Sequence, residues 1–185
     1  EEVIIADDGS SEETLHIINQ FRENSALNLI HSWQDDNGFR AAKSRNKAIA
    51  KSNENYIILI DGDMVLHPKF VEDHINHAEQ GYFVQGARVL LTQSKAQSAL
   101  KEMKTDFSGL SSGLKNRKNA IHSNFLSKLF LQKKNYLRGI KTCNMAFFRK
   151  DCIAINGFNN GFEGWGREDS EFIVRLLNNG INRKN

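Results

Sequence analysis

Apolar and polar residues alternate in blocks along the first ninety residues of the chain. Short apolar runs at 2–6, 27–31 and 55–60 are followed by stretches, beginning near residues 10, 39 and 68, in which apolar residues recur every three or four positions. The runs predict buried strands, and the spaced stretches predict amphipathic helices. Strands that alternate with helices favour right-handed βαβ units. We therefore expect an α/β fold with a mainly parallel, partly mixed sheet flanked by helices.

The helices are expected to begin and pack in defined ways. Ser10 followed by Glu13 resembles a capping box, and Pro68 suits the first turn of a helix. Residues at helical spacing on the three helices are expected to face the sheet: Leu15, Ile18 and Phe21; Ala41, Ala42, Arg45, Ala48 and Ile49; Phe70, Val71, His74, Ile75 and Ala78.

The run from Asn55 ends abruptly in two carboxylates, Asp61 and Asp63. Its length and richness in isoleucine predict a central strand buried on both faces. The carboxyl ends of such strands are where open α/β sheets bind ligands, and residues i and i+2 point to one side. The two acids therefore suit one cation, while Gly62 lets a ligand approach the backbone. The pattern alone also fits a solvated turn.

The second half of the chain is less regular. Tyr82 to Leu91 and Cys143 to Phe148 read as strands, whereas Ser94 to Arg138 is polar, with weak helical periodicity around Phe125, Leu129 and Phe130, and is expected to be a basic helical insertion. A short helix over 151–155, a glycine-rich loop over 158–166 and a helix over 168–179 follow. In this last helix Phe172, Ile173, Leu176 and Leu177 form the predicted buried face, and Gly180 is its expected C-terminal cap.

Composition narrows the class of protein. The chain has 185 residues, of which 39% are hydrophobic and 25% are charged, as in an ordinary globular domain. No apolar run is long enough to span a membrane, and no signal peptide is evident. Cys143 and Cys152 form neither a disulfide framework nor a zinc site, so we expect two buried small residues and a reducing compartment.

Charge is concentrated in the insertion. Between Lys95 and Lys141 there are eleven lysines and arginines but only two acids, although the whole chain carries a net charge of +3. A solvated surface is the simplest interpretation. Contact with anionic lipid or an acidic glycan is the alternative, whereas nucleic acid is disfavoured because aromatic residues are sparse and no nucleic-acid module is recognised.

Acidic pairs recur at predicted strand ends and helix starts: Asp7 with Asp8, Asp61 with Asp63, and Glu168 with Asp169. A helix N-terminus stabilises a carboxylate, which is the form that a general base requires. Phe162 and Trp165 nearby offer flat faces of the kind that stack on sugars. Simple helix capping by Glu168 and Asp169 is the alternative explanation.

A series of motifs along the chain resembles a known family. Residues 4–11 (IIADDGSS), 37–46 (NGFRAAKSRN) and 58–63 (ILIDGD) resemble the signatures of family 2 glycosyltransferases with the GT-A, Rossmann-like fold. The segments 143–150 (CNMAFFRK) and 161–172 (GFEGWGREDSEF) are similar to the galactosyltransferase-type C-terminal module of bacterial chondroitin-type polymerases and animal β-1,4-galactosyltransferases. These motifs cover most of the chain outside the insertion.

The resemblance implies a role for each motif residue. Asp8 would read the base of the nucleotide, Arg45 would lie near the nucleotide or its phosphates, and Asp61 would contact the ribose or the metal. Asp63 would ligate Mn²⁺ or Mg²⁺, and Asp169 would be the catalytic base. Glu168 would bind the acceptor, and Trp165 would line the acceptor side of the site.

The resemblance also implies a reaction and its setting. An inverting transferase would move a hexosyl or N-acetylhexosaminyl group from a nucleotide diphosphate, expected to be UDP, to a glycan or lipid-linked saccharide in bacterial surface polysaccharide synthesis. We expect residues 1–93 to bind the nucleotide sugar, 94–141 to be the insertion, and 142–185 to bind the acceptor and carry the base. The expected location is cytoplasmic, or peripheral at the inner membrane surface.

The chain also departs from the family. The usual first strand is absent before Glu1, and the late histidine that often completes the metal shell does not follow Glu171, which suggests a fragment. Surface or core roles are favoured for His74 and His77, and His67 is an outside candidate for a metal ligand.

Two other functions remain open. Haloacid-dehalogenase-like phosphatases also end a strand in Asp-x-Asp, but near the start of the chain and with Thr where Val65 stands. A non-catalytic carbohydrate-binding protein is the second alternative. An EF-hand is excluded because the later ligands and the closing Glu are missing.

Overall fold

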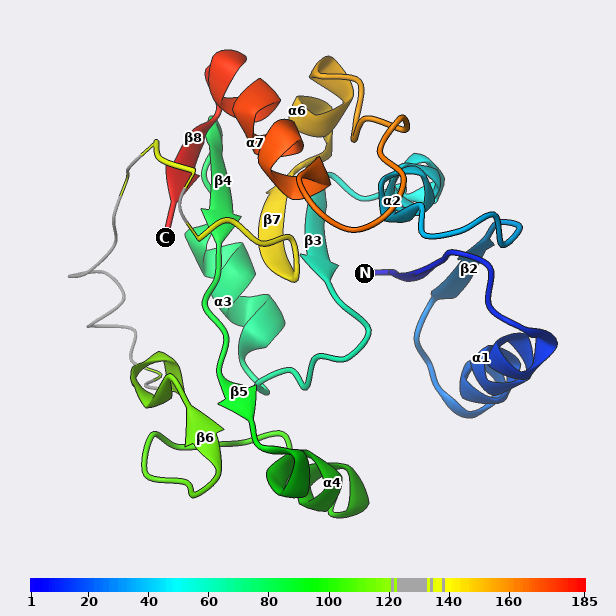
Figure 1. The fold of residues 1–185 in the computed structure, drawn as a ribbon, viewed down its shortest axis with the longest axis vertical. Coiled ribbons are helices and arrows are strands. Elements are labelled where there is room, and N and C mark those ends of the chain that lie inside the picture. The colour runs from blue at the N-terminus through cyan, green and yellow to red at the C-terminus, as the bar shows by residue number, and fades with distance from the viewer. Residues whose placement is uncertain (121, 123–132, 134, 138) are drawn as a thin grey trace. The chain divides into compact units, whose positions relative to one another are not determined.

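A computed structural model describes residues 1–120, 122, 133, 135–137 and 139–185 (Figure 1). Its first half alternates strands and helices, as the pattern of apolar residues predicts. The elements are β1 (Val3–Asp7), α1 (Glu12–Asn24), β2 (Leu29–Trp33), α2 (Ala41–Lys51), β3 (Tyr56–Ile60), α3 (Phe70–His77) and β4 (Tyr82–Gln85).

The second half contains shorter elements. They are β5 (Leu90–Leu91), α4 (Gln93–Lys101), β6 (Leu114–Lys115), the 3₁₀ helix η1 (Arg117–Ala120), β7 (Asn144–Phe148), α6 (Arg149–Ala154), α7 (Glu168–Asn178) and β8 (Asn182–Lys184). The single strand expected over 82–91 is divided into β4 and β5. Gly86 lies in this break, where its backbone N–H donates to the Asn144 carbonyl and an added side chain would clash with Asn144. Strand β8 was not expected.

The strands of the described chain form three sheets, and the four-stranded one is mixed, as expected. β1 and β2 pair in parallel, from Val3 opposite Leu29 to Asp7 opposite Trp33. The four-stranded sheet has the order β3-β7-β4-β8, in which β4 runs antiparallel to β7 and parallel to β8. The prediction of a central, fully buried β3 is wrong. The strand stands first in this order, and none of its residues is fully buried. An apolar run shows that a strand is hydrophobic, but it does not show how many strands lie beside it.

The described chain forms two compact units. One contains Glu1–Ile57 and Phe148–Gly180, and the other contains Ile58–Phe147 and Ile181–Asn185. Each unit is therefore assembled from segments that are distant in the sequence. The expected division at residues 93 and 141 concerned binding roles, and it stays a prediction.

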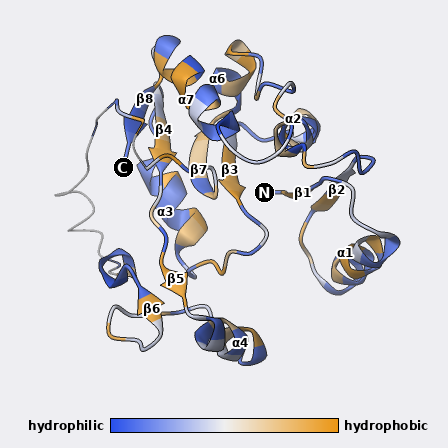
Figure 2. Ribbon diagram, viewed as in Figure 1, coloured by the Kyte–Doolittle hydropathy of each residue, from blue (hydrophilic) through white to orange (hydrophobic). Residues whose placement is uncertain are grey.

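Helix α7 provides much of the core of the first unit. Phe172, Ile173 and Leu176 are fully buried, as their helical spacing predicts, and Phe158 stacks on Phe172 with a ring-centroid distance of 3.9 Å. Gly180 has a φ of +81°, a conformation that glycine adopts readily after a helix end. Figure 2 shows apolar residues gathered in β3, β4 and β5, whereas α4 presents mostly polar residues.

Helices α1 and α3 are less buried than their patterns predict. In α1 only Ile18 is buried, while Leu15 and Phe21 are exposed; in α3 only His74 is buried, while Val71 and Ile75 are exposed. The capping box is also wrong: α1 begins after Ser11, whose side chain makes no capping hydrogen bond. The backbone N–H of Ser10 donates to Asp7 Oδ1 (2.8 Å), so Asp7 stabilises the turn before the helix and does not cap the helix itself.

The insertion is only partly described. Its described residues form α4, an antiparallel β5–β6 pair and η1, so the expectation of a helical segment is met only in part. The weak periodicity around Phe125, Leu129 and Phe130 lies outside the described residues.

Both cysteines are free and buried, as expected, and burial raises the pKa of Cys152 to about 12. No helix among the described residues has the length and apolar character that a membrane span requires.

Candidate functional site

Asp7 stabilises the turn that follows β1. It is 4% exposed, accepts the Ser10 N–H and lies 2.7 Å from His31 Nε2 on β2. Burial alone would raise the pKa of Asp7, but the hydrogen bonds from Ser10 and His31 outweigh it and lower that pKa. Asp7 is therefore a structural carboxylate.

Asp8 is held by the loop after β2. Its Oδ1 accepts from Gln34 Nε2 and its Oδ2 from the backbone N–H of Arg40, both at 2.5 Å. Gln34 is only 3% exposed, and its Oε1 finds no hydrogen-bond partner among the described residues. A buried unpaired acceptor is costly and suggests that a donor is missing, so Asp8 and Gln34 form a polar pair suited to a ligand with N–H groups.

Arg45 joins α2 to the start of α7. Its Nη1 lies 3.1 Å from Asp169 Oδ1 and 3.6 Å from Glu168 Oε1, and its side chain is 17% exposed. The resemblance predicted that Arg45 lies near a nucleotide. The structure brings it together with the two acids of α7, a pairing that no sequence pattern indicated.

The two acids of α7 differ in their surroundings. The Glu168 side chain is 9% exposed and its Oε2 accepts the Gly166 N–H at 3.1 Å, whereas the Asp169 side chain is 26% exposed. Arg167, the residue before the helix, has a φ of +68°, and its side chain does not cap the helix. Glu168 and Asp169 therefore lie in a first turn whose backbone N–H groups carry partial positive charge. Asp169 is the more accessible of the two and is suited to accept a proton.

Asn46 fixes the segment that leads to this helix. Its Nδ2 donates to the Phe158 carbonyl (2.7 Å) and to Asn160 Oδ1 (2.7 Å), and its Oδ1 accepts the Phe158 N–H (2.8 Å). The Phe158 ring then stacks on Phe172 of α7 and lies 5.5 Å from the Arg45 guanidinium. Neighbouring residues of α2 thus hold the loop and the acids. Sequence reasoning missed Asn46, because only the contacts across 112 residues reveal its role.

Trp165 stands out from the glycine-rich loop. It is 92% exposed between Gly164 and Gly166, whose φ values are +81° and +110°. These conformations are accessible to glycine and strained for other residues. The Gly164 N–H donates to the Phe39 carbonyl at 2.8 Å, which anchors the loop and leaves the indole ring free to stack on a ligand.

Asp61 and Asp63 belong to the second unit, at the carboxyl end of β3. Asp61 is partly buried, its carbonyl accepts the Met64 N–H (3.2 Å), and Asp63 is exposed. Burial and the Asp61 charge both raise the pKa of the Cys143 thiol. Two carboxylates separated by one residue are hard oxygen donors that fit Mn²⁺ or Mg²⁺. Among the described residues they belong to no group of three candidate ligands, so ligand oxygens or water would have to complete the shell.

His74 has a core role, as expected. It is buried, its Nε2 lies 2.8 Å from Asn144 Oδ1, and burial lowers its pKa. The His77 ring contacts the Asp73 carbonyl at 2.8 Å.

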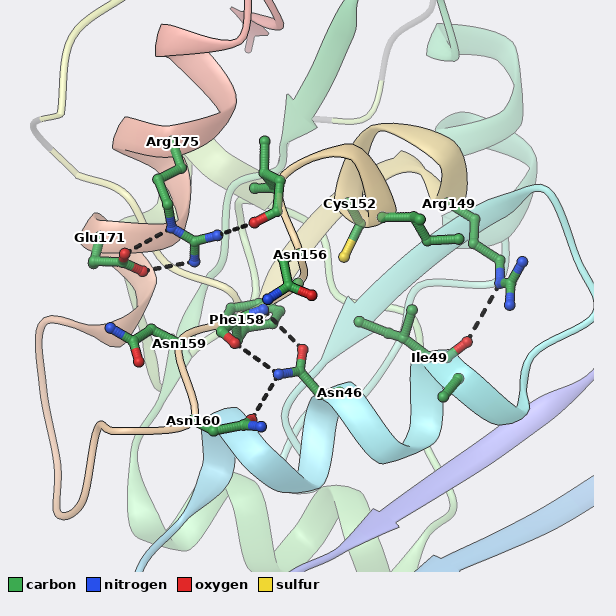
Figure 3. A pocket seen from close by; sticks show the side chains of 14 residues that line it. Asn46, Ile49, Arg149, Cys152, Asn156, Phe158, Asn159, Asn160, Glu171 and Arg175 are labelled. Atoms are coloured by element: carbon green, nitrogen blue, oxygen red, sulfur yellow. Dashed lines mark hydrogen bonds and ion pairs between the residues drawn. The ribbon is translucent and has the colours of Figure 1, made fainter.

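A cavity of about 800 Å³ in the first unit lies beside α2, α6 and α7 (Figure 3). Its lining contains Arg175, which is paired with Glu171 and donates to the Ile155 carbonyl, and Asn46, which is occupied by the Phe158 backbone. Neither Arg45 nor Asp169 lines it. Its polar groups largely satisfy one another, so the cavity is not the predicted site.

Comparison with protein families gives two matches. The model of Glycosyl transferase family 2 matches residues 1–154, and the model described as the N-terminal domain of galactosyltransferase matches residues 126–184. Both agree with the resemblance read from the motifs.

The chain is also similar to curated polysaccharide synthases. It is 28% identical to a hyaluronan synthase of Pasteurella multocida and 27% identical to a chondroitin synthase of Escherichia coli, in each case over 97% of the chain. The alignments cover 20% and 28% of those proteins, so the chain spans less than a third of their length.

Solved structures share its fold. S. aureus TarS matches 99% of this chain and 29% of its own, with a TM-score of 0.60 and 17% identity. A mannosyltransferase from Pyrobaculum calidifontis, determined in complex with GDP-Man and Mn²⁺, matches 98% of this chain and 44% of its own, with a TM-score of 0.57 and 17% identity. The GT-A fold predicted from the motifs is thereby confirmed.

Proposed function

Because the chain belongs to glycosyltransferase family 2, we propose that it is an inverting, metal-dependent transferase that moves a sugar from a UDP donor to a glycan or lipid-linked saccharide. The similarity to bacterial hyaluronan and chondroitin synthases supports a role in surface polysaccharide synthesis.

The observation that carries the proposal is the ion pair between Arg45 and Asp169. An acceptor hydroxyl must lose its proton as its oxygen attacks the anomeric carbon, and a carboxylate held in one orientation can receive that proton. Arg45 provides the orientation, and the exposure of Asp169 provides the access. Attack in a single in-line displacement inverts the anomeric configuration.

The acceptor is proposed to contact Glu168 and Trp165. The exposed indole ring offers a face on which a sugar ring can stack, and Glu168 can accept a hydroxyl hydrogen bond. This role agrees with the position of both residues around the start of α7.

The donor is proposed to contact the other acids. Asp8 and Gln34 would recognise the base, because the unpaired Gln34 Oε1 can accept an N–H. Asp61 and Asp63 would hold Mn²⁺ or Mg²⁺, which when bound neutralises the charge of the departing diphosphate. The resemblance also places Arg45 near the nucleotide, which is an alternative to its orienting role.

In this proposal, residues 1–93 bind the donor, and residues 142–185 bind the acceptor and carry the base. A cytoplasmic location, with the basic insertion touching the inner membrane surface, completes the proposal. The exposed side chains of Leu100 and Met103, close in sequence to Lys101 and Lys104, are compatible with such contact.

The test is release of UDP from a panel of UDP-sugars, with and without Mn²⁺ and with saccharide acceptors. Wild-type protein is expected to release UDP only with metal, and Asp63→Asn is expected to lose at least about 100-fold of this activity. Glu12→Gln, an exposed acid of α1, is the matched control. Sugar binding without any metal-dependent UDP release would favour a carbohydrate-binding protein instead.

A further inference from the structure

Three potential metal ligands converge in the second unit, outside the proposed transfer site. One ligand atom from each of His67, Asp73 and His122 lies within 4.8 Å of the others. His67 precedes α3, Asp73 lies in its first turn, and His122 follows η1. The rings of His67 and His122 are stacked at 4.8 Å, and His122 Nε2 lies 2.9 and 3.1 Å from the two oxygens of Asp73.

A fourth ligand is close to this group. Asp106 Oδ1 lies 3.9 Å from His67 Nε2. Two imidazoles and two carboxylates form the kind of donor set that binds zinc tetrahedrally. We propose that His67, Asp73, Asp106 and His122 form a Zn²⁺ site.

The distances are compatible with a zinc ion. Ligand atoms about 2.0–2.1 Å from a tetrahedral zinc ion are roughly 3.3 Å from one another. The 2.9 Å separation between His122 and Asp73 must therefore widen slightly as zinc replaces the proton between them. The 3.9 Å separation between His67 and Asp106 must shorten, and so must the separations of up to 4.8 Å that join His67 to the other two ligands. These carboxylates and imidazoles are all at least partly exposed, so their side chains can make such adjustments.

One existing contact opposes metal binding. The Lys69 N–H donates to His67 Nδ1 at 3.1 Å. Zinc bound at Nδ1 uses the lone pair that accepts this hydrogen bond. Zinc bound at Nε2 leaves the proton of the neutral ring on Nδ1, so Nδ1 can no longer accept. Lys69 lies at the exposed start of α3, where water can accept its N–H instead.

The donor set distinguishes this site from the proposed diphosphate metal site. Imidazole nitrogens favour zinc and similar transition metals, whereas Asp61 and Asp63 offer only the hard oxygens that suit Mg²⁺ and Mn²⁺. Four protein ligands would leave no open position, which is typical of a structural ion. Zinc here would link residues 106 and 122 of the insertion to the start of α3.

The test is zinc binding by metal-stripped full chain, measured by competition with a chromophoric chelator. Asp61→Asn/Asp63→Asn protein is expected to keep one tight zinc per chain. His122→Asn in that background should weaken binding by more than about 100-fold, since even loss of an outer-shell partner costs 10- to 100-fold. His16→Asn, at an exposed histidine of α1, is the control and should bind as tightly as its parent.

Cobalt gives an independent readout of geometry. Co²⁺ in the same protein should show the intense visible bands of tetrahedral coordination, and His122→Asn should lose them. Circular dichroism in EDTA checks that both variants are folded, which is expected because His122 is exposed. Unchanged zinc affinity in His122→Asn would overturn the site, as would loss of all tight zinc in the Asp61→Asn/Asp63→Asn protein.

Discussion

The acidic pair Glu168 and Asp169 and the acidic pair Asp61 and Asp63 differ in how the protein holds them. In the first unit, Arg45 pairs with Asp169 and Glu168, and Asn46 fixes the preceding turn, so the carboxylates are positioned by the protein itself. In the second unit, Asp63 is exposed in the turn that follows β3. Under the proposed function, the first region is preorganised for proton transfer, whereas the second needs its ligand to complete the metal site. The following experiments test this contrast.

The largest effect is expected for Asp169→Asn. The amide cannot accept the acceptor proton, so turnover should fall by about 10²- to 10⁴-fold while donor binding changes little. Steady-state kinetics with calorimetry of nucleotide binding measures both quantities. Glu171→Gln, which changes an acid paired with Arg175 on the same helix, is the control. Turnover near the wild-type value in Asp169→Asn would rule out the assignment of the base.

Arg45→Met separates the two roles considered for this arginine. If Arg45 orients Asp169, kcat should fall by about 10- to 100-fold with little change in the donor KM. Asp61→Asn should instead weaken donor binding in the presence of Mn²⁺. Arg45→Lys should recover part of kcat, because a cation remains beside the carboxylate. A raised donor KM with unchanged kcat in Arg45→Met would instead indicate that Arg45 binds the nucleotide.

Asn46→Ala is expected to lower the free energy of unfolding by about 1–3 kcal/mol, because the buried Phe158 backbone loses its partners. Asp63→Asn, an exposed substitution, should stay within about 0.5 kcal/mol of wild type. Urea denaturation measures both. Equal stability of the two variants would contradict the difference between the region held by Asn46 and the exposed region around Asp63.

The smallest effect concerns mild acid. Burial lowers the pKa of His74 below its ordinary value of 6.5, so the unfolded chain binds a proton more readily than the folded one. The stability that this neutral histidine contributes is present above pH 6.5 and is lost as the pH falls towards the folded pKa. Asp7, with a lowered pKa, should lose its contribution only below 3.8.

Urea midpoints at pH 7 and pH 5 test this difference. His74→Gln should show a smaller loss of stability between these pH values than wild type. Glu12→Gln, at an exposed acid of α1, is the control and should show the same loss as wild type over this interval. An identical pH dependence in wild type and His74→Gln would contradict the role of His74.

Local patterns predicted much of the fold. Buried Phe172, Ile173 and Leu176 follow helical spacing, and Gly180 ends α7 as expected. Where the patterns were wrong, burial depended on distant partners. Phe21 and Ile75 have helical spacing but remain exposed, and β3 is apolar but stands first in the sheet order.

The sequence by itself determined the family, the GT-A fold and the residues that could carry chemistry, because ordered motifs and hydrophobic periodicity are local properties. Only the tertiary structure decided which side chains meet: Arg45 with Asp169, Gln34 with Asp8, and His67 with Asp73 and His122. Such pairings join residues up to 124 positions apart. They arise from the packing of whole elements, which no local pattern of residues specifies.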